Sequence, residues 1–372
     1  LPQSDRRSLD ASLSKTKQLD AVGTIQLLGS VAMDSMRVTA GVDSYPRLGD
    51  RVYAAPHTFV ANLPSLMESE EKAESKVLLK LGSIDIARES AVSIRPEKLF
   101  GRHCAILGAT GGGKSWTTAR IIEECLRYKT KIVLLDATSE YRGLAGDFVS
   151  HAHLGSPVNT AMNSQQCSLP PTSFVESDFI ALFEPSGKVQ GPKMRAAIRS
   201  LRLANLVPKV ASNGIIKKID QPKAPVVSAE QIAGVAEKLD DPRQEFDVAK
   251  LTAQIEQECV YPDGFGTARG TKDTTKWGGD SGAFSYCLSL VSRINAILTA
   301  PSFSCVFNSN SPSLTDAIDE FVTDDKRLFR ICLSGVAYEF KAREIVANVI
   351  GRHMLNKARG GEYAASPIVV IV

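Results

Sequence analysis

The chain has 372 residues, of which 43% are hydrophobic and 23% charged, with a formal net charge of +3. These values are typical of a globular protein with two or three domains, and they exclude a strongly basic or acidic chain. The seven cysteines occur singly, without a C-x-x-C pair, which argues against a zinc site and a disulfide framework. No apolar run approaches the length of a membrane span, so we predict a cytoplasmic protein without a membrane partner.

The first hundred residues are predicted to form a small domain behind a polar arm at residues 1–21. Short strand-like stretches follow the arm, separated by Gly, Pro and Asp: Gly23–Leu28, Met36–Val42, Asp50–Ala54 and Val77–Leu81. A series of short strands of this kind predicts a small β-barrel, here over residues 22–97.

The chain is organised around residues 108–115, which fit the P-loop pattern G-x-x-x-x-G-K-[ST]. The short apolar run His103–Leu107 precedes the motif and predicts a buried strand. Apolar residues repeat at helical spacing after it, namely Ile121, Ile122, Cys125 and Leu126. A glycine-rich turn that binds nothing is the simpler alternative, but the strand–loop–helix context favours nucleotide binding.

The motif has a direct chemical meaning. Glycines allow successive backbone N–H groups to face phosphate oxygens, and the helix N-terminus adds a partial positive charge. Lys114 is expected to reach the β- and γ-phosphates, and the hydroxyl of Ser115 is expected to ligand Mg²⁺. ATP and Mg²⁺ are therefore the predicted cofactors.

From Leu99 onward strands and helices alternate, which predicts an α/β fold with a parallel sheet covered by helices. Cys104 and Cys125 are predicted to be small core residues. Later elements are expected at Thr130–Asp136 (strand), Leu328–Leu333 (strand), Lys341–Lys357 (helix) and Pro367–Val372 (strand). Asp136 and Glu140 follow the first of these strands. Carboxylates in such a position point into the crevice where open α/β sheets bind ligands.

Residues of about 155–300 are predicted to be a mainly helical insertion. Within it, Lys193–Leu206 has the pattern of an amphipathic helix with a basic stripe formed by Arg195, Arg199 and Arg202. A long loop, Gly264–Gly282, carries Arg269, Lys272 and Lys276. A basic stripe is usually a solvated face, and contact with DNA or a partner is the alternative.

Two stretches together resemble a known family. The run Leu99–Thr117, followed by Asp136–Tyr141, resembles the HerA branch of the HerA/FtsK ATPases, hexameric rings that pump double-stranded DNA. The resemblance implies a RecA-like P-loop ATPase core at residues 98–372 behind the N-terminal barrel. The stretch Leu182–Lys193 resembles the bacterial members that work beside an effector enzyme in defence against phage.

The resemblance also assigns residue roles. Lys114, Glu140 and Arg102 take catalytic positions, with Arg102 close to the nucleotide; a surface arginine at a strand start is the alternative for it. Ser115 and Asp136 take the metal positions. The nucleotide-contacting positions are Gly108, Thr110, Gly111, Gly112, Gly113, Lys114, Ser115 and Trp116.

The Walker B carboxylates are the main departure from the family. The family places them after a strand near the C-terminus, which Pro367–Val372 resembles, and no acidic residue follows in this sequence. We therefore expect the sequence to be a fragment that binds nucleotide, of a protein that hydrolyses it. In the rival interpretation Asp136 is itself the Walker B aspartate, because it ends an apolar strand.

The resemblance implies a ring-shaped, ATP-driven motor that translocates or unwinds double-stranded DNA beside a nuclease or a sirtuin-like, NAD-consuming effector in antiphage defence. A DNA-end-processing helicase with a NurA-like nuclease is one alternative. A P-loop scaffold or regulator without DNA translocation and a small-molecule phosphoryl transferase are others. A homo-oligomer, most simply a hexamer, is expected for the motor.

Overall fold

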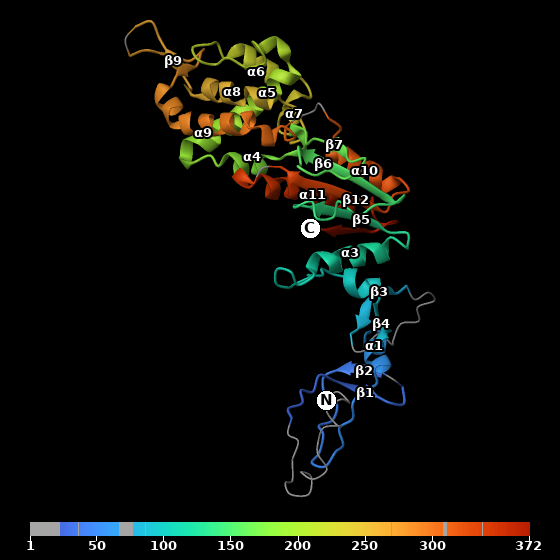
Figure 1. Cartoon of the computed structure of the whole chain (residues 1–372). Helices are drawn as coiled ribbons and strands as arrows, with labels where there is room; N and C mark the ends of the chain where they lie inside the picture. Colours follow the sequence, from blue (N-terminus) through green and yellow to red (C-terminus); the bar gives the residue numbers. More distant parts are fainter. Residues whose placement is uncertain are drawn as a thin grey trace. The chain divides into compact units, whose positions relative to one another are not determined.

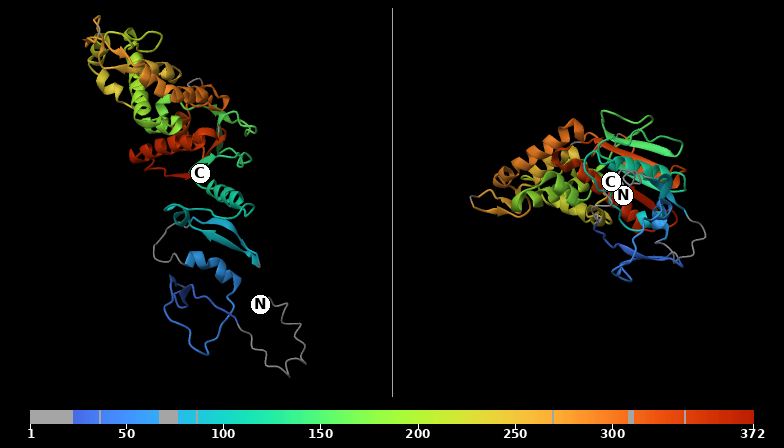
Figure 2. Two further views of the ribbon diagram at one scale, coloured as in Figure 1. Left: turned by 90° about the vertical axis from the view of Figure 1, so that its left-hand side faces the viewer. Right: turned by 60° about the horizontal axis from the view of Figure 1, so that its bottom comes forward.

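The structure, a computed structural model, describes residues 23–35, 37–66, 77–85, 87–268, 270–307, 311–336 and 338–372. The chain divides into two compact units, Leu1–Ala105 and Ile106–Val372. The ribbon of each unit is shown in Figures 1 and 2. The predicted N-terminal arm at residues 1–21 lies outside the described residues.

The described part of the first unit contains two antiparallel hairpins and two helices. Its elements are β1 (Gly29–Ala32), β2 (Arg37–Ala40), α1 (His57–Leu66), β3 (Leu79–Ile84), β4 (Ala87–Ile94) and α2 (Pro96–Phe100). Strand β1 pairs with β2 and β3 with β4, while α1 packs against β4. The hairpins form two separate sheets, so the closed barrel stays a prediction.

The predicted strands of this unit agree only in part with the structure. Met36–Val42 overlaps β2, and Val77–Leu81 overlaps β3. Gly23–Leu28 and Asp50–Ala54 are both described and form no strand, so the prediction was wrong there. Neither stretch has a pairing strand within the described residues, and short apolar runs do not specify a partner.

A five-stranded parallel sheet forms the centre of the second unit. Its strands, in spatial order, are β13 (Ile368–Ile371), β5 (Lys131–Asp136), β12 (Leu328–Gly335), β6 (Val149–Gly155) and β7 (Gln165–Cys167). Every residue of β5 is buried, as expected for an inner strand covered on both faces. The sequence-predicted strands at 130–136, 328–333 and 367–372 are confirmed, and the fold is an α/β sheet consistent with a P-loop ATPase core.

Nine α-helices accompany this sheet in the described residues. They are α3 (Lys114–Cys125), α4 (Glu176–Phe183), α5 (Gly187–Leu206), α6 (Ala224–Glu230), α7 (Val235–Leu239), α8 (Leu251–Glu258), α9 (Ser281–Thr299), α10 (Leu314–Thr323) and α11 (Ala342–Arg359). The predicted helix at Lys341–Lys357 corresponds to α11 and is confirmed. None of the described helices is long and apolar enough to cross a bilayer.

The helices α4 to α9 lie between β7 and β12 in the chain and pack mainly on one another. Helix α5 contacts both α8 and α9, and the group is seen together at the upper left of Figure 1. Two short hairpins belong to this segment: β8 (Val260–Tyr261) pairs with β11 (Gly278–Gly279), and β9 (Gly264–Phe265) pairs with β10 (Lys272–Asp273). The long loop predicted at 264–282 is thus partly ordered by strand pairing.

The apolar run ahead of the P-loop is the clearest error of the sequence analysis. His103–Leu107 pairs with no strand among the described residues, and Leu107 is 88% exposed. Both edges of β5 are occupied, by β12 and β13, so no position beside that strand remains for it. Cys104 is consequently exposed and not a core residue, whereas Cys125 is buried as predicted.

Candidate functional site

The P-loop adopts a conformation that needs glycine at defined positions. Gly113 precedes helix α3 with a left-handed φ of 82°, a conformation that residues with a Cβ rarely adopt. A Cβ on Gly112 would lie 2.9 Å from the carbonyl oxygen of Ala109, and the N–H of Gly112 donates to that same oxygen. The loop is therefore folded tightly onto itself directly before the N-terminus of a 12-residue helix.

Lys114 lies across this loop. Its Nζ donates to the carbonyl oxygen of Ala109 over 3.0 Å. Gly108 leaves room for the aliphatic part of the lysine, because a Cβ there would lie 3.4 Å from Cγ of Lys114. The ammonium group and the helix N-terminus thus present positive charge at one place, which suits the phosphates of a nucleotide.

Ser115 meets the carboxylate that the sequence analysis selected from a distant part of the chain. Its hydroxyl donates to Oε2 of Glu140 over 2.5 Å. The neighbouring hydroxyls of Thr117 and Thr118 donate to carbonyl oxygens one turn earlier, at Gly113 and Lys114. A serine hydroxyl and a carboxylate from two different elements therefore converge at the P-loop.

Glu140 lies on the segment after β5, residues 136–141, which we call the acidic loop. Asp136 organises this loop: its Oδ1 accepts from the backbone N–H of Thr138 at 3.3 Å and of Glu140 at 3.1 Å. Its Oδ2 accepts from the N–H of Tyr141 at 2.9 Å and from Nε of Arg330 at 2.7 Å. Asp136 is only 1% exposed, so its carboxylate is engaged within the protein.

This geometry bears on the predicted metal position of Asp136. Both of its oxygens hold the acidic loop and the buried Arg330, while Glu140 is the carboxylate that reaches Ser115. The arrangement favours a structural role for Asp136 over direct metal contact. Its metal role stays a prediction.

Arg330 was not selected from the sequence. It lies on β12 between apolar neighbours, and its side chain is completely buried. A charged residue in the middle of the run Leu328–Leu333 is the signal that could have found it, because a buried charge requires a partner. No local pattern indicates that this partner is Asp136, 194 positions earlier.

Two further predicted site residues are exposed. Trp116 follows Ser115 on α3, and 84% of its surface is accessible. Arg102 is exposed and belongs to the first unit. Their contacts to a nucleotide stay predictions, as does that of Thr110.

The residues at this site fit Mg²⁺ better than a metal with nitrogen or sulfur ligands. Among the described residues, no group of three or more His, Cys, Asp or Glu side chains is placed to hold a metal ion. Mg²⁺ is usually held by one or two protein oxygens together with phosphate and water oxygens. The hydroxyl of Ser115 and the carboxylate of Glu140 supply such oxygens beside the phosphate-binding loop.

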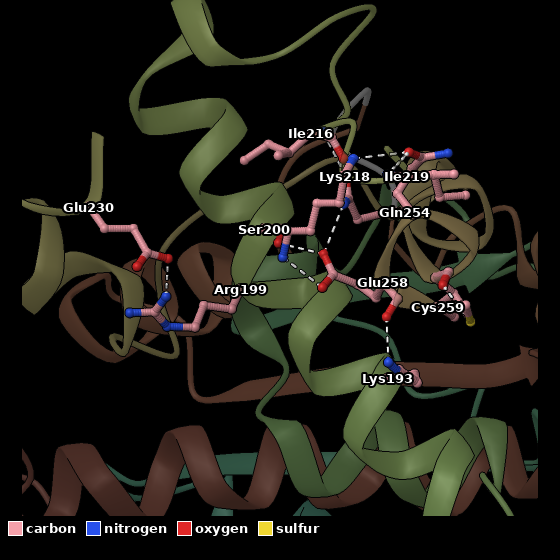
Figure 3. A network of polar contacts seen from close by, with 12 residues as sticks. Lys193, Arg199, Ser200, Ile216, Lys218, Ile219, Glu230, Gln254, Glu258 and Cys259 are labelled. Carbon is pink, nitrogen blue, oxygen red and sulfur yellow. Dashed lines mark hydrogen bonds and ion pairs between the residues drawn. The ribbon is translucent and has the colours of Figure 1, made fainter. Parts of the chain in front are cut away.

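The predicted basic stripe on α5 is occupied by contacts within the protein. Arg195 is paired with Glu176, and Arg199 with Glu230, the second pair being visible in Figure 3. Arg202 donates to the carbonyl oxygen of Leu239 at 3.0 Å. The stripe therefore joins α5 to its neighbours, and the structure favours this intramolecular role over DNA contact.

Helix α5 also forms hydrogen bonds with a buried glutamate on α8. Glu258 accepts from Ser200 at 2.6 Å and from Nζ of Lys218 at 2.7 Å (Figure 3). Its backbone carbonyl accepts from Lys193.

In the second predicted basic group, Lys276 lies 3.6 Å from Asp273, Lys272 is exposed, and Arg269 is outside the described residues.

Comparison with known families agrees with this geometry. Residues 79–259 match the family described as "Helicase HerA, central domain". This stretch is therefore similar to a HerA-type central domain. It contains the P-loop, Glu140 and the helices up to α8, and it implies an ATPase of the HerA/FtsK type that uses ATP and Mg²⁺. No curated protein matches the chain.

Proposed function

We propose that this HerA-type protein is an ATP-driven motor that translocates or unwinds double-stranded DNA. The proposal rests on one observation: the hydroxyl of Ser115, directly after the P-loop lysine, donates to Oε2 of Glu140 over 2.5 Å. A carboxylate beside the magnesium-binding hydroxyl can help to hold Mg²⁺ and can activate water. A motor requires both to hydrolyse ATP at each step.

In this proposal each residue of the site has a distinct role. Lys114 binds the β- and γ-phosphates after its ammonium leaves the Ala109 carbonyl, and the N-terminus of α3 assists it. Ser115 and Glu140 would hold Mg²⁺, which would neutralise charge on the phosphates. Glu140 also orients the attacking water or accepts its proton. Arg102 stabilises charge on the γ-phosphate, by analogy with the family.

The assembly in this proposal is a closed hexamer with the N-terminal barrel at its subunit contacts. Its partner is a nuclease, or an NAD-consuming effector of sirtuin type, in defence against phage. The support is the resemblance of Leu182–Lys193 to members that work beside such enzymes. Light scattering with and without nucleotide tests the assembly, and a monomer under both conditions argues against a ring.

The central experiment measures ATP hydrolysis with and without duplex DNA. We expect hydrolysis that duplex DNA stimulates and that Lys114→Ala abolishes. Hydrolysis without any effect of DNA would favour the scaffold or small-molecule alternatives. Absence of hydrolysis by folded protein that binds ATP and includes the Walker B carboxylates that the family places after the last strand would contradict the motor.

DNA contact is proposed for the loop with Arg269, Lys272 and Lys276, because the stripe on α5 is engaged internally. Replacing the three loop residues with Gln should weaken duplex binding. It should also lower the slope of log affinity against log salt by about 0.9 for each phosphate that the variant no longer neutralises. The matched control replaces Arg195, Arg199 and Arg202 with Gln, which should change stability and leave the salt slope unchanged.

A further inference from the structure

Arg330 is a buried cation with an incomplete set of partners. Its Nε donates to Asp136 at 2.7 Å, and its Nη2 donates to the hydroxyl of Ser139 at 3.0 Å. Its Nη1 is buried and has no hydrogen-bond partner among the described residues. A leucine or methionine in this strand would avoid the cost of an unpaired buried donor. The arginine is therefore poorly explained by stability alone.

Ser139, the second partner, holds an unusual backbone conformation. It has a left-handed φ of 65° although it is not glycine, and it is 5% exposed. Its hydroxyl accepts from Arg330 and donates to the carbonyl oxygen of Asn159 at 3.0 Å. Such conformations persist where surrounding contacts impose them, and they are frequent at functional sites.

Ser139, which Arg330 contacts, directly precedes Glu140, which contacts Ser115. Arg330 holds Asp136 and Ser139, Asp136 accepts the N–H of Glu140, and the carboxylate of Glu140 meets Ser115. The acidic loop has a second attachment, because Nη1 of Arg343 donates to the carbonyl oxygen of Ala137 at 2.9 Å. The direction of the Glu140 side chain thus depends on contacts made from β12 and α11.

We propose that Arg330, acting with Ser139, is a positioning residue that sets Glu140 against Ser115. The inference rests on the proposed ATPase function of this site. Arg330 does not touch the nucleotide; it acts through the acidic loop. Its planar guanidinium reaches both Asp136 and Ser139, which the single ammonium of a lysine does less well.

The chain offers a matched control on the same sheet. Lys131, at the other end of β5, is also a buried cation, and its Nζ donates to Oδ1 of Asp324 at 3.0 Å. Its other hydrogen bonds within the described residues go to the backbone carbonyls of Phe321 and Asp324, away from the acidic loop. Lys131→Met therefore removes a comparable buried charge at a distance from the site.

The experiment compares Arg330→Lys, Ser139→Ala and Lys131→Met in the full chain, each alone and together with Glu140→Gln. Urea unfolding gives the folded fraction, to which kcat is normalised. We expect Arg330→Lys and Ser139→Ala to lower kcat about 10-fold or more, as changes around a site's direct ligands do. The affinity for ATP without Mg²⁺ should change by less than about 3-fold, because Arg330 does not touch the nucleotide. Lys131→Met should leave kcat per folded molecule unchanged.

The double variants show whether Arg330 acts through Glu140. In the Glu140→Gln background, Arg330→Lys and Ser139→Ala should cause no further loss. An unchanged kcat in folded Arg330→Lys and Ser139→Ala would overturn the inference. Losses that add to that of Glu140→Gln, or an equal loss in Lys131→Met, would overturn it as well.

A binding measurement separates this inference from the proposed function. The chain has two tryptophans, so Trp277→Phe leaves Trp116, beside Ser115, as the reporter of ATP binding. If the parent binds ATP more tightly with Mg²⁺ but does not hydrolyse it, the proposed function fails. The inference then still predicts that Mg²⁺ no longer raises the affinity of Arg330→Lys for ATP. An Arg330→Lys variant whose ATP affinity still rises with Mg²⁺ as in the parent would overturn the inference.

Discussion

The two ends of strand β5 carry the same kind of interaction and serve different purposes. At the start of the strand, Lys131 is paired with Asp324 at 3.0 Å and donates to the backbone carbonyls of Phe321 and Asp324. At its end, Asp136 is paired with Arg330 at 2.7 Å. Both pairs join β5 to later parts of the chain; in the first the cation is buried, and in the second both partners are.

The difference lies in what surrounds each pair. The contacts of Lys131 end at the last turn of α10 and the residue that follows it. Those of Asp136 extend through the acidic loop to Glu140 and Ser115. The carboxyl ends of parallel strands are where open α/β sheets bind ligands. The position of a buried ion pair along the strand therefore decides whether it supports the fold alone or also a site.

The largest expected effect is on nucleotide binding at the end of the strand. Lys114→Ala should weaken ATP binding about 10²- to 10⁴-fold, because it removes charge-assisted hydrogen bonds to two phosphates, about 1.5–3 kcal/mol each. The urea midpoint should stay unchanged. Calorimetric titration of ATP measures the effect, with the exposed Lys129→Ala as control. An affinity equal to that of the parent would remove the P-loop assignment.

Glu140→Gln should separate binding from hydrolysis. The amide keeps the size of the side chain but loses the basic carboxylate, so kcat should fall about 10²- to 10⁴-fold. ATP binding without Mg²⁺ should be largely retained. Glu123→Gln on the solvent side of α3 is the control, since its carboxylate lies 3.6 Å from Arg120 and is mostly exposed. Equal hydrolysis by Glu140→Gln and the parent would show that another group serves as the base.

Lys131→Met should affect stability and not activity. It leaves the buried carbonyl oxygen of Phe321 and the partly buried one of Asp324 without this donor, which is expected to cost about 1–3 kcal/mol. The loss stays moderate because the side chain of Asp324 is 38% exposed and remains solvated. Urea denaturation measures it. If Lys131→Met instead reduced kcat per folded molecule, the distinction between the two ends of β5 would fail.

The smallest effect is a dependence of stability on pH at the Arg330 end. His151 pairs in register with Arg330, and its pKa is lowered by burial first and by the charge of Arg330 second, against a bond to the Leu144 carbonyl that raises it. The unfolded chain therefore binds a proton more readily than the folded one. Stability is complete above the ordinary histidine pKa of about 6.5 and is lost as the pH falls from there towards the folded pKa.

The measurement compares urea midpoints at about pH 7.5 and about pH 5.5, a window in which most carboxylates stay ionised. We expect the difference between the two midpoints to shrink in His151→Gln. His153, on the same strand, has a pKa lowered by burial alone, so His153→Gln shows the contribution of burial without the charge of Arg330. A pH dependence unchanged in both variants would contradict the assignment.

Several features of the protein followed from local sequence because their causes are local. The glycines before Lys114 are required by the conformation of the loop itself, and the helix after them is confirmed as α3. The apolar run before Asp136 could be recognised as a buried strand, since strands covered on both faces need continuous apolar side chains. A carboxylate at the end of that strand could be expected near a ligand, because the carboxyl ends of parallel strands border the binding crevice.

Other features depended on partners far away in the chain. The pattern of Arg195, Arg199 and Arg202 shows a basic face, but only the positions of Glu176, Glu230 and Leu239 reveal that its arginines are engaged within the chain. The run His103–Leu107 has the composition of a strand and yet pairs with none among the described residues. Strand pairing depends on which neighbours are in place, and composition does not encode them.

The site also combines features that local sequence predicts with features that depend on distant parts of the chain. The sequence alone identified Ser115 and Glu140 as separate candidates, since each belongs to a recognisable local pattern. Their contact, and the support of Glu140 by Arg330 from a strand much later in the chain, exist because β12 lies beside β5 in the sheet. Strand order is set by the packing of the whole domain, so only the tertiary structure decided which carboxylate faces the P-loop and which holds the loop in place.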